Sequence, residues 1–162
     1  MNTNYVVNND LIQRISNPGF TELLKEVLLK GKPFRFQAAG YSMSPFIRSG
    51  DLITISPVSD PLRIGDIVAF INPCNNKLSV HRIISKVPNG YLLRGDNSPK
   101  EDGIVLLNEI FGRVIHIERN GRRVRLGLGS ERIIIAFLSR YNWLIVLLSP
   151  FRRIKMLLKK AG

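Results

Sequence analysis

Cysteine is almost absent from this sequence, because Cys74 is the only one in 162 residues. A single cysteine cannot form an internal disulfide, so the fold does not depend on oxidative pairing. Histidine is also scarce: His81 and His116 lie far apart in the chain, and neither belongs to a cluster with metal-ligand spacing. The sequence therefore predicts neither a disulfide framework nor a metal site, and we expect no cofactor.

Acidic residues are scarce in the last third of the chain. Residues 1–111 contain 12 Lys and Arg against 10 Asp and Glu, whereas residues 112–162 contain 12 against 2, Glu118 and Glu131. The net charge of +12 therefore belongs mainly to the last third. A surface with that electrostatic field favours an anionic partner: a membrane, a nucleic acid or an acidic protein.

Residues 1–33 are expected to form an N-terminal helical segment. Residues 1–9 are polar and rich in asparagine, so we expect no secretory signal peptide there. Residues 10–30 predict one or two amphipathic helices, because apolar residues recur at helical spacing on both sides of Asn17-Pro18-Gly19. Gly31 is expected to cap the second helix, and Pro33 prevents its continuation.

Residues 34–128 predict a β-rich domain. Apolar runs with many Val and Ile alternate with turn residues, and the expected strands are 34–39, 51–56, 66–72, 78–87, 91–95, 109–119 and 122–128. Asn89-Gly90 and Asn120-Gly121 predict hairpins, because both central positions of a type I′ turn need positive φ. Residues 56–64 and 95–103 are expected to be loops. The expected fold class is mainly β with flanking helices (α+β).

Residues 129–162 form the third expected segment. Residues 133–151 are apolar except for Arg140, Asn142 and the Ser and Pro positions, and the basic stretch Arg152 to Lys160 follows. A transmembrane helix would carry Arg140 near its middle, at a cost of about 2.5–3.5 kcal/mol. A small β domain could not cover a core helix that is apolar on all sides. We expect helices at the interface of an anionic membrane, split at Ser149-Pro150, and a membrane-associated protein at the cytoplasmic face.

The stretch Gly40-Tyr41-Ser42-Met43-Ser44-Pro45 contains a candidate nucleophile. Glycine lets the backbone turn sharply and proline fixes φ, so this turn would lift the Ser42 hydroxyl out of the sheet. A serine alone is a poor nucleophile and needs a base within hydrogen-bond reach. Without a base, the stretch would be an ordinary polar turn between two strands.

His81 is the candidate base. It lies in a predicted strand, whereas His116 precedes a hairpin and is interpreted as a structural or surface residue. The loop after the His81 strand contains Asp96 and Asp102. Either carboxylate could accept the Nδ1–H of His81, which would leave Nε2 free to take the proton of Ser42.

Four short motifs together resemble type I signal peptidases: Ser42-Met43-x-Pro45, Gly65-Asp66-Ile67-Val68, Val80-His81-Arg82-Ile83, and Gly95-Asp96-Asn97 followed by Asp102. They lie within residues 36–113 in the order of that family. Within the LexA/signal peptidase superfamily, the resemblance is to the branch of the endoplasmic reticulum, archaea and sporulating bacteria, in which histidine is the base. The LexA-like self-cleaving peptidases carry a lysine at the position of His81.

The resemblance implies a role for each matching residue. Ser42 would be the nucleophile, His81 the general base, Asp102 the third catalytic residue and Asp96 the structural aspartate of the loop. Many signal peptidases have a hydroxyl side chain at the position of Gly40, and it helps to line the oxyanion hole. Here the hole would rest on backbone N–H groups such as that of Ser42, and loss of one donor typically costs about 10²–10³ in rate.

The resemblance also implies a signal-peptidase-like β catalytic domain that pairs with an extended peptide. Small residues would precede the cut at the first and third positions. The expected activity is that of a serine endopeptidase that cleaves a leader or precursor peptide through an acyl-enzyme. The expected substrate-binding residues are Phe36, Ala38, Tyr41, Met43, Leu78 and Val80.

Two other interpretations stay open from the sequence. A non-enzymatic basic β domain could bind nucleic acid, although the aromatic residues are not interleaved with the basic residues of 113–125 as base stacking requires. A catalytically inactive homologue could use the same domain for docking. The partners we expect are a peptide substrate and an anionic membrane surface, and no nucleic acid.

Overall fold

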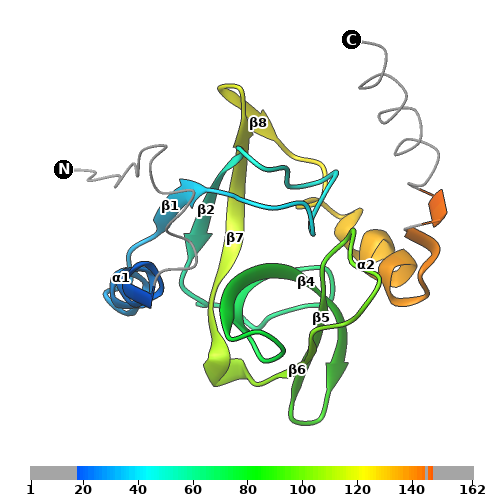
Figure 1. Ribbon diagram of the computed structural model, residues 1–162, viewed down its shortest axis with the longest axis horizontal. Helices are drawn as coiled ribbons and strands as arrows, with labels where there is room; N and C mark the ends of the chain where they lie inside the picture. The colour runs from blue at the N-terminus through cyan, green and yellow to red at the C-terminus, as the bar shows by residue number, and fades with distance from the viewer. Residues whose placement is uncertain (1–17, 145, 148–162) are drawn as a thin grey trace.

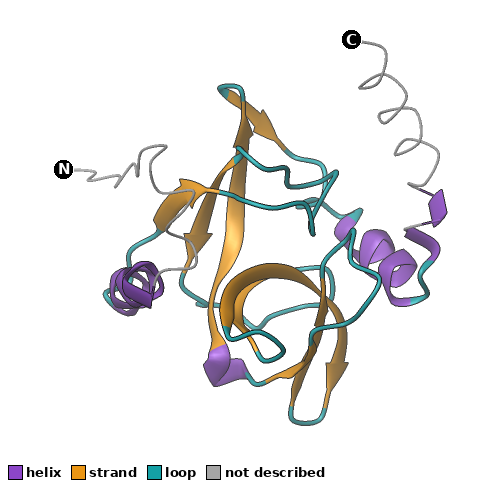
Figure 2. Ribbon diagram, viewed as in Figure 1, coloured by secondary structure: helices purple, strands orange, loops and turns teal. Residues whose placement is uncertain are grey.

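The computed structural model describes residues 18–144 and 146–147. Within them, one 8-stranded antiparallel sheet has the order β1-β2-β7-β3-β4-β5-β6, and β8 pairs with β7. The sheet curls, and β4 follows a wide arc through it (Figures 1 and 2). The strands are β1 (Phe34–Gln37), β2 (Leu52–Ser56), β3 (Ile67–Asn72), β4 (Lys77–Val87), β5 (Gly90–Arg94), β6 (Gly103–Val105), β7 (Ile110–Arg119) and β8 (Arg122–Val124).

The mainly β class with flanking helices is confirmed. Each predicted strand overlaps an observed one, usually with slightly different ends. The last predicted strand, 122–128, is shorter than expected: β8 ends at Val124, and the chain then turns through Gly127 at φ +96°. The short strand β6 was not predicted, because three residues are too few for an alternating pattern to show.

The two Asn-Gly pairs behave differently. Asn120 (φ +51°) and Gly121 (φ +73°) form the positive-φ turn between β7 and β8, as predicted. The other hairpin turns at Pro88-Asn89, because Val87 pairs with Gly90. The type I′ prediction for Asn89-Gly90 was therefore wrong. Glycine is needed there for packing, since a Cβ on Gly90 would lie 2.5 Å from the carbonyl oxygen of Val105 in β6.

Helix α1 (Pro18–Leu29) covers one end of the sheet with Phe20, Leu24 and Leu28. Pro18 and Gly19 belong to the described helix and do not precede it, and proline is tolerated in the first turn of a helix. The predicted C-cap is confirmed: Gly31 has φ +72°, and its N–H donates to the carbonyl of Leu28 at 2.9 Å. The helix predicted before Pro18 lies outside the described residues.

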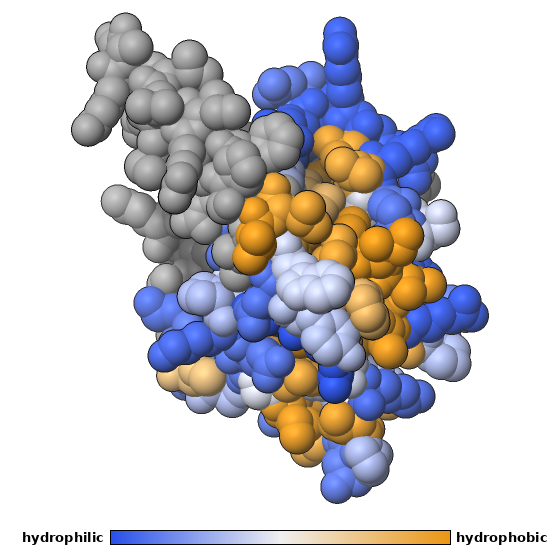
Figure 3. All heavy atoms as spheres, turned by 90° about the vertical axis from the view of Figure 1, so that its right-hand side faces the viewer, coloured by the Kyte–Doolittle hydropathy of each residue, from blue (hydrophilic) through white to orange (hydrophobic). Residues whose placement is uncertain are grey.

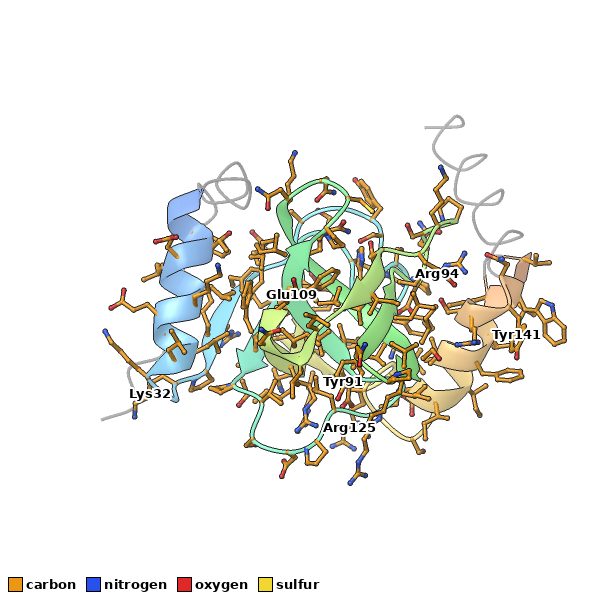
Figure 4. All side chains as sticks on the ribbon, turned by 90° about the horizontal axis from the view of Figure 1, so that it is seen from below. Lys32, Tyr91, Arg94, Glu109, Arg125 and Tyr141 are labelled. Carbon is orange, nitrogen blue, oxygen red and sulfur yellow. The ribbon has the colours of Figure 1, made fainter. Side chains whose placement is uncertain are left out.

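Helix α2 (Arg132–Arg140) lies on the opposite side of the molecule from α1 (Figures 1 and 4). Its buried residues include Ile135 and Ala136, and Ile135 packs with Phe46 and Leu144. One face of this apolar helix is thus covered by the β domain, which the sequence did not predict. The helix ends at Tyr141 and Asn142, whereas the predicted break at Ser149-Pro150 lies outside the described residues. None of the helices in the described part of the chain has the length and apolar character to cross a membrane.

Candidate active site

Ser42, His81 and Asp102 form a continuous chain of hydrogen bonds. The Nε2 atom of His81 lies 2.8 Å from Oγ of Ser42, and its Nδ1 atom lies 2.6 Å from Oδ2 of Asp102. His81 and Asp102 are buried, at 7% and 6% exposure, while Ser42 is exposed at the surface. An imidazole held between a hydroxyl and a carboxylate in this way can accept the hydroxyl proton and be stabilised as the cation.

The two aspartates of the loop therefore have different surroundings. Asp102 contacts His81, and its backbone N–H donates to the carbonyl of Leu93 at 3.0 Å. Asp96 does not contact the imidazole but accepts two hydrogen bonds from Arg82, each 2.8 Å long. The sequence alone left this choice open, and the structure places Asp102, not Asp96, beside the imidazole.

The turn that carries Ser42 is fixed by backbone contacts with the same loop. The N–H of Asn97 donates to the carbonyl of Ser42 at 2.7 Å, and the Asn97 side-chain amide donates to the carbonyl of Tyr41 at 3.1 Å. Gly40 has φ +91°, and a Cβ there would meet no heavy atom within 4 Å. Backbone conformation, not crowding, therefore favours glycine at this position. That the backbone N–H of Ser42 donates a hydrogen bond in an oxyanion hole stays a prediction.

Gly95 permits the close approach of this loop to the nucleophile. A Cβ on Gly95 would lie 2.8 Å from the carbonyl oxygen of Ser42 and 3.1 Å from Nε2 of His81. No side chain fits in that space without displacing the serine or the imidazole. The Gly95-Asp96-Asn97 motif thus combines a close approach, a buried carboxylate and a brace for the Ser42 turn.

Arg82 connects the catalytic strand to two other parts of the domain. Its guanidinium is fully buried, pairs with Asp96, and donates from Nη1 to the carbonyls of Gly65 and Gly127 at 2.8 and 2.9 Å. Asp66, which follows Gly65 in the chain, accepts a hydrogen bond from the backbone N–H of Arg63 at 2.9 Å. The Gly-Asp motif at positions 65 and 66 therefore supports the strand next to His81 without reaching the hydroxyl.

Another buried carboxylate, that of Asp51, supports the chain that follows the nucleophile. Asp51 binds the guanidinium of Arg119 through both oxygens, at 2.8 and 2.7 Å. Arg119 also donates to the carbonyl of Phe46 at 3.1 Å. These hydrogen bonds to Asp51 raise the pKa of Arg119 above its ordinary value. The pair anchors residues 46–51 to β7 and so fixes the segment that leads away from Ser42.

Asn72 is a site residue that sequence reasoning missed. It is buried at the end of β3, its side-chain amide donates to Oδ1 of Asp102 at 2.6 Å, and its side-chain oxygen accepts the N–H of Cys74 at 2.8 Å. The only available signal was one amide at the end of an otherwise apolar strand, Ile67–Asn72. Both oxygens of Asp102 are thus engaged, one by His81 and one by Asn72.

Replacement of Asn72 by alanine is expected to lower kcat by about 10–100-fold, because a hydrogen bond to a charged group is worth about 1.5–3 kcal/mol. KM should change little, since Asn72 does not line the cavity that opens beside Ser42 and His81. Steady-state kinetics on one peptide substrate would measure this split. Asn75→Ala is the matched control, because Asn75 caps the same turn through the N–H of Lys77 without touching Asp102. Equal losses in both variants would contradict a positioning role.

A cavity of about 150 Å³ opens beside the hydroxyl. Five of the six predicted substrate-binding residues line it, together with Ser42 and His81. The exception is Tyr41, whose side chain is 72% exposed and outside the cavity. Ile47 and Ile53 also line it and were not predicted. The five predicted residues are Phe36, Ala38, Met43, Leu78 and Val80.

The described residues contain no group of three His, Cys, Asp or Glu side chains that could hold a metal ion. The functional groups that meet at this site are the hydroxyl of Ser42, the imidazole of His81 and the carboxylate of Asp102. Those groups suit nucleophilic attack with general-base assistance.

Comparison with known proteins gives one family. No curated protein matches the chain. The family model described as Peptidase S24-like matches residues 10–115, which include Ser42, His81 and Asp102 as well as strands β1 to β6. This match supports the LexA/signal peptidase superfamily that the four motifs indicated. Since it covers more than half of the sequence, the chain belongs to the Peptidase S24-like family.

Proposed function

We propose that this protein is a serine endopeptidase in which Ser42 is the nucleophile, His81 the general base and Asp102 the group that orients the base. The observation that supports this best is the chain of two short contacts, Ser42 to His81 and His81 to Asp102, beside an apolar cavity. Family membership supports a peptidase, and the imidazole supports the histidine branch of the superfamily.

The reaction follows from the positions of these atoms. Oγ of Ser42 attacks the scissile carbonyl carbon while Nε2 of His81 takes the hydroxyl proton. His81 then gives this proton to the leaving amine, and the C–N bond breaks to leave an acyl-enzyme. Water attacks the ester under the same base, which returns the proton to Ser42. Asp102 stays ionised and stabilises the imidazolium that forms in each half-reaction.

An extended peptide is the substrate that suits the cavity. β1 is the first strand in the sheet order, and its pairing with β2 continues to Ala38, whose N–H donates to the carbonyl of Asp51 at 2.8 Å. β5 pairs with β4 only from Arg82 onward, so residues 77–81 pair with β3 alone. A peptide between these two edges would gain main-chain hydrogen bonds and place alternate side chains in the cavity. The cavity volume favours small apolar side chains near the cut.

A fluorophosphonate probe tests the proposal without knowledge of the natural substrate. The native protein should be labelled on Ser42, as located by peptide mapping with mass spectrometry. His81→Ala should lose most of the labelling, because the hydroxyl then lacks its base. Ser44→Ala, two positions further along the turn, should be labelled like the native protein.

Labelling that is equally fast in His81→Ala, or that occurs at another serine, would contradict the proposal. Absence of labelling in a native protein that folds normally would favour the inactive homologue. A library of internally quenched peptides would then identify a cleavable sequence for kinetics.

A further inference from the structure

Helix α2 and the residues after it carry an apolar face that nothing in the described structure covers. Its residues are each between 52% and 64% exposed, and large apolar side chains gathered on one exposed surface mark an interaction site. The space-filling view shows an apolar area, with paler aromatic side chains at its centre, on the side of the molecule where α2 lies (Figure 3). We call it the α2 surface: Ile133, Ile134, Phe137, Tyr141, Trp143 and Leu147.

These side chains form a continuous surface. Ile133, Phe137 and Tyr141 follow one another at intervals of four residues, so they share one face of the helical turn. The ring centroids of Phe137 and Tyr141 are 4.8 Å apart, and those of Tyr141 and Trp143 are 6.4 Å apart. The opposite face of α2 is already buried against the β domain. Apolar residues on both faces indicate a second contact for this helix.

The charged residues of the last third of the chain favour an anionic partner. Exposed arginines lie in and just after β8, at positions 122, 123 and 125, and at the end of α2, at position 140. The two acidic residues of the last third are already engaged: Glu118 binds Arg35 at 2.7 Å, and Glu131 accepts the N–H of Gly127 at 2.7 Å. Beyond Leu147 the sequence of residues 148–162 adds five Lys and Arg and no Asp or Glu.

The chemistry of the α2 surface distinguishes a membrane from other anionic partners. A nucleic acid would bring phosphates against isoleucine and leucine, which offer them no hydrogen bond. Trp and Tyr together with Ile and Phe are the side chains that insert at the boundary between lipid headgroups and acyl chains, and flanking arginines bind anionic headgroups. We propose that the α2 surface binds the face of an anionic lipid membrane.

Arg94 links this surface to the candidate active site. From β5 it donates to the carbonyls of Ser98 and Pro99 in the catalytic loop, at 2.9 and 2.8 Å. It also donates to the carbonyl of Ser139 at 2.9 Å and to the side-chain oxygen of Asn142, both at the end of α2. Arg94 lies on the side of the sheet that α2 covers (Figure 4). Lipid binding would therefore hold the loop of Asp96 and Asp102 close to the membrane.

The substrate class follows if the proposed peptidase function is correct. A site held near lipid headgroups would act on extended peptide segments that emerge from a membrane or lie on it. This second step rests on the proposed function, whereas lipid binding itself does not.

Trp143 supplies a direct test, because it is the only tryptophan in the chain. On addition of vesicles of phosphatidylcholine mixed with phosphatidylserine, whose negative surface attracts basic segments, its emission should shift to the blue and be quenched by brominated acyl chains. Vesicles of phosphatidylcholine alone should give a much smaller change. Higher salt should weaken binding but leave an apolar remainder.

Phe137→Glu should lower the partition coefficient in vesicle sedimentation by about tenfold or more, since the variant loses the burial of a phenylalanine side chain and places a carboxylate against anionic headgroups. Leu29→Glu is the matched control, because Leu29 is 88% exposed on α1, on the opposite side of the molecule. It should bind vesicles like the native protein. Both replacements are at exposed positions, and their melting temperatures would verify folding.

Several results would overturn the proposal. Sedimentation with vesicles while Trp143 stays unquenched and Phe137→Glu binds normally would mean that only the basic residues bind lipid. Self-association that Phe137→Glu abolishes, without vesicle binding, would make the α2 surface an interface between copies. Binding to duplex DNA with a steep salt dependence, and none to vesicles, would indicate a nucleic-acid partner.

One further result separates the two proposals. If vesicles bind but the fluorophosphonate probe does not label Ser42, the lipid-binding proposal stands and the peptidase proposal falls.

Discussion

Replacement of Ser42 by alanine is expected to lower the rate of peptide cleavage by about 10⁶-fold, and replacement of His81 by alanine should cost about as much. The two residues act in one step: the hydroxyl cannot attack without losing its proton, and the imidazole that takes this proton has no acyl-enzyme to form without the hydroxyl. The double variant should therefore be no slower than either single one. Asp102→Ala should cost less, about 10⁴-fold, because it orients the base without reacting.

These rates are measured as kcat/KM on an internally quenched peptide, with the melting temperature recorded for each variant. His116→Ala is the matched control for histidine replacement, since His116 lies in β7 and does not line the cavity. It should retain the native rate. If instead the rate losses of the two single variants multiply in the double variant, Ser42 and His81 act in separate steps. The proposed mechanism would then be wrong.

The strands could largely be predicted because local patterns determine them. Alternating apolar residues define each strand, and turn residues define its ends. Both signals are local, so they do not depend on the order of the strands in the sheet. β6 was missed because three residues are too few to show a period, and its partner β5 is what holds it in place. The face of α2 that packs on Phe46 was missed because its burial depends on a surface more than 80 residues earlier in the chain.

The candidate site was more predictable than its surroundings. Ser42, His81 and Asp102 carry chemistry that restricts the residue type, so short motifs reveal them. Asn72 and Arg94 act through hydrogen bonds to residues 30 and 48 positions away, which no local pattern contains. Tyr41 was placed in the cavity because a substrate was expected to pair with a strand that continues from Phe36 to Tyr41, but β1 ends at Gln37 and Tyr41 lies in the turn that carries Ser42. Its side chain therefore faces solvent.

The second large effect concerns stability and involves Asp96. Its carboxylate is 1% exposed and pairs through both oxygens with Arg82, which is fully buried. Removal of one member of a buried ion pair leaves a charge without its partner in a medium of low polarity, and this typically costs about 3–5 kcal/mol. We therefore expect Asp96→Ala to lower the melting temperature by about 10 °C or more.

Thermal unfolding distinguishes this role from catalysis when Asp96→Ala is compared with Asp102→Ala. Asp102→Ala should lose turnover with a smaller loss of stability, while Asp96→Ala should lose stability and retain cleavage at temperatures where it is still folded. Glu26→Ala removes an exposed ion pair with Lys30 and should leave the melting temperature nearly unchanged, since such pairs are screened by water. Asp96→Ala combined with Arg82→Met should be more stable than Asp96→Ala alone, because the unpaired guanidinium is then removed. If the double variant loses as much stability as the two single variants together, Arg82 stabilises the fold mainly through its hydrogen bonds to the carbonyls of Gly65 and Gly127.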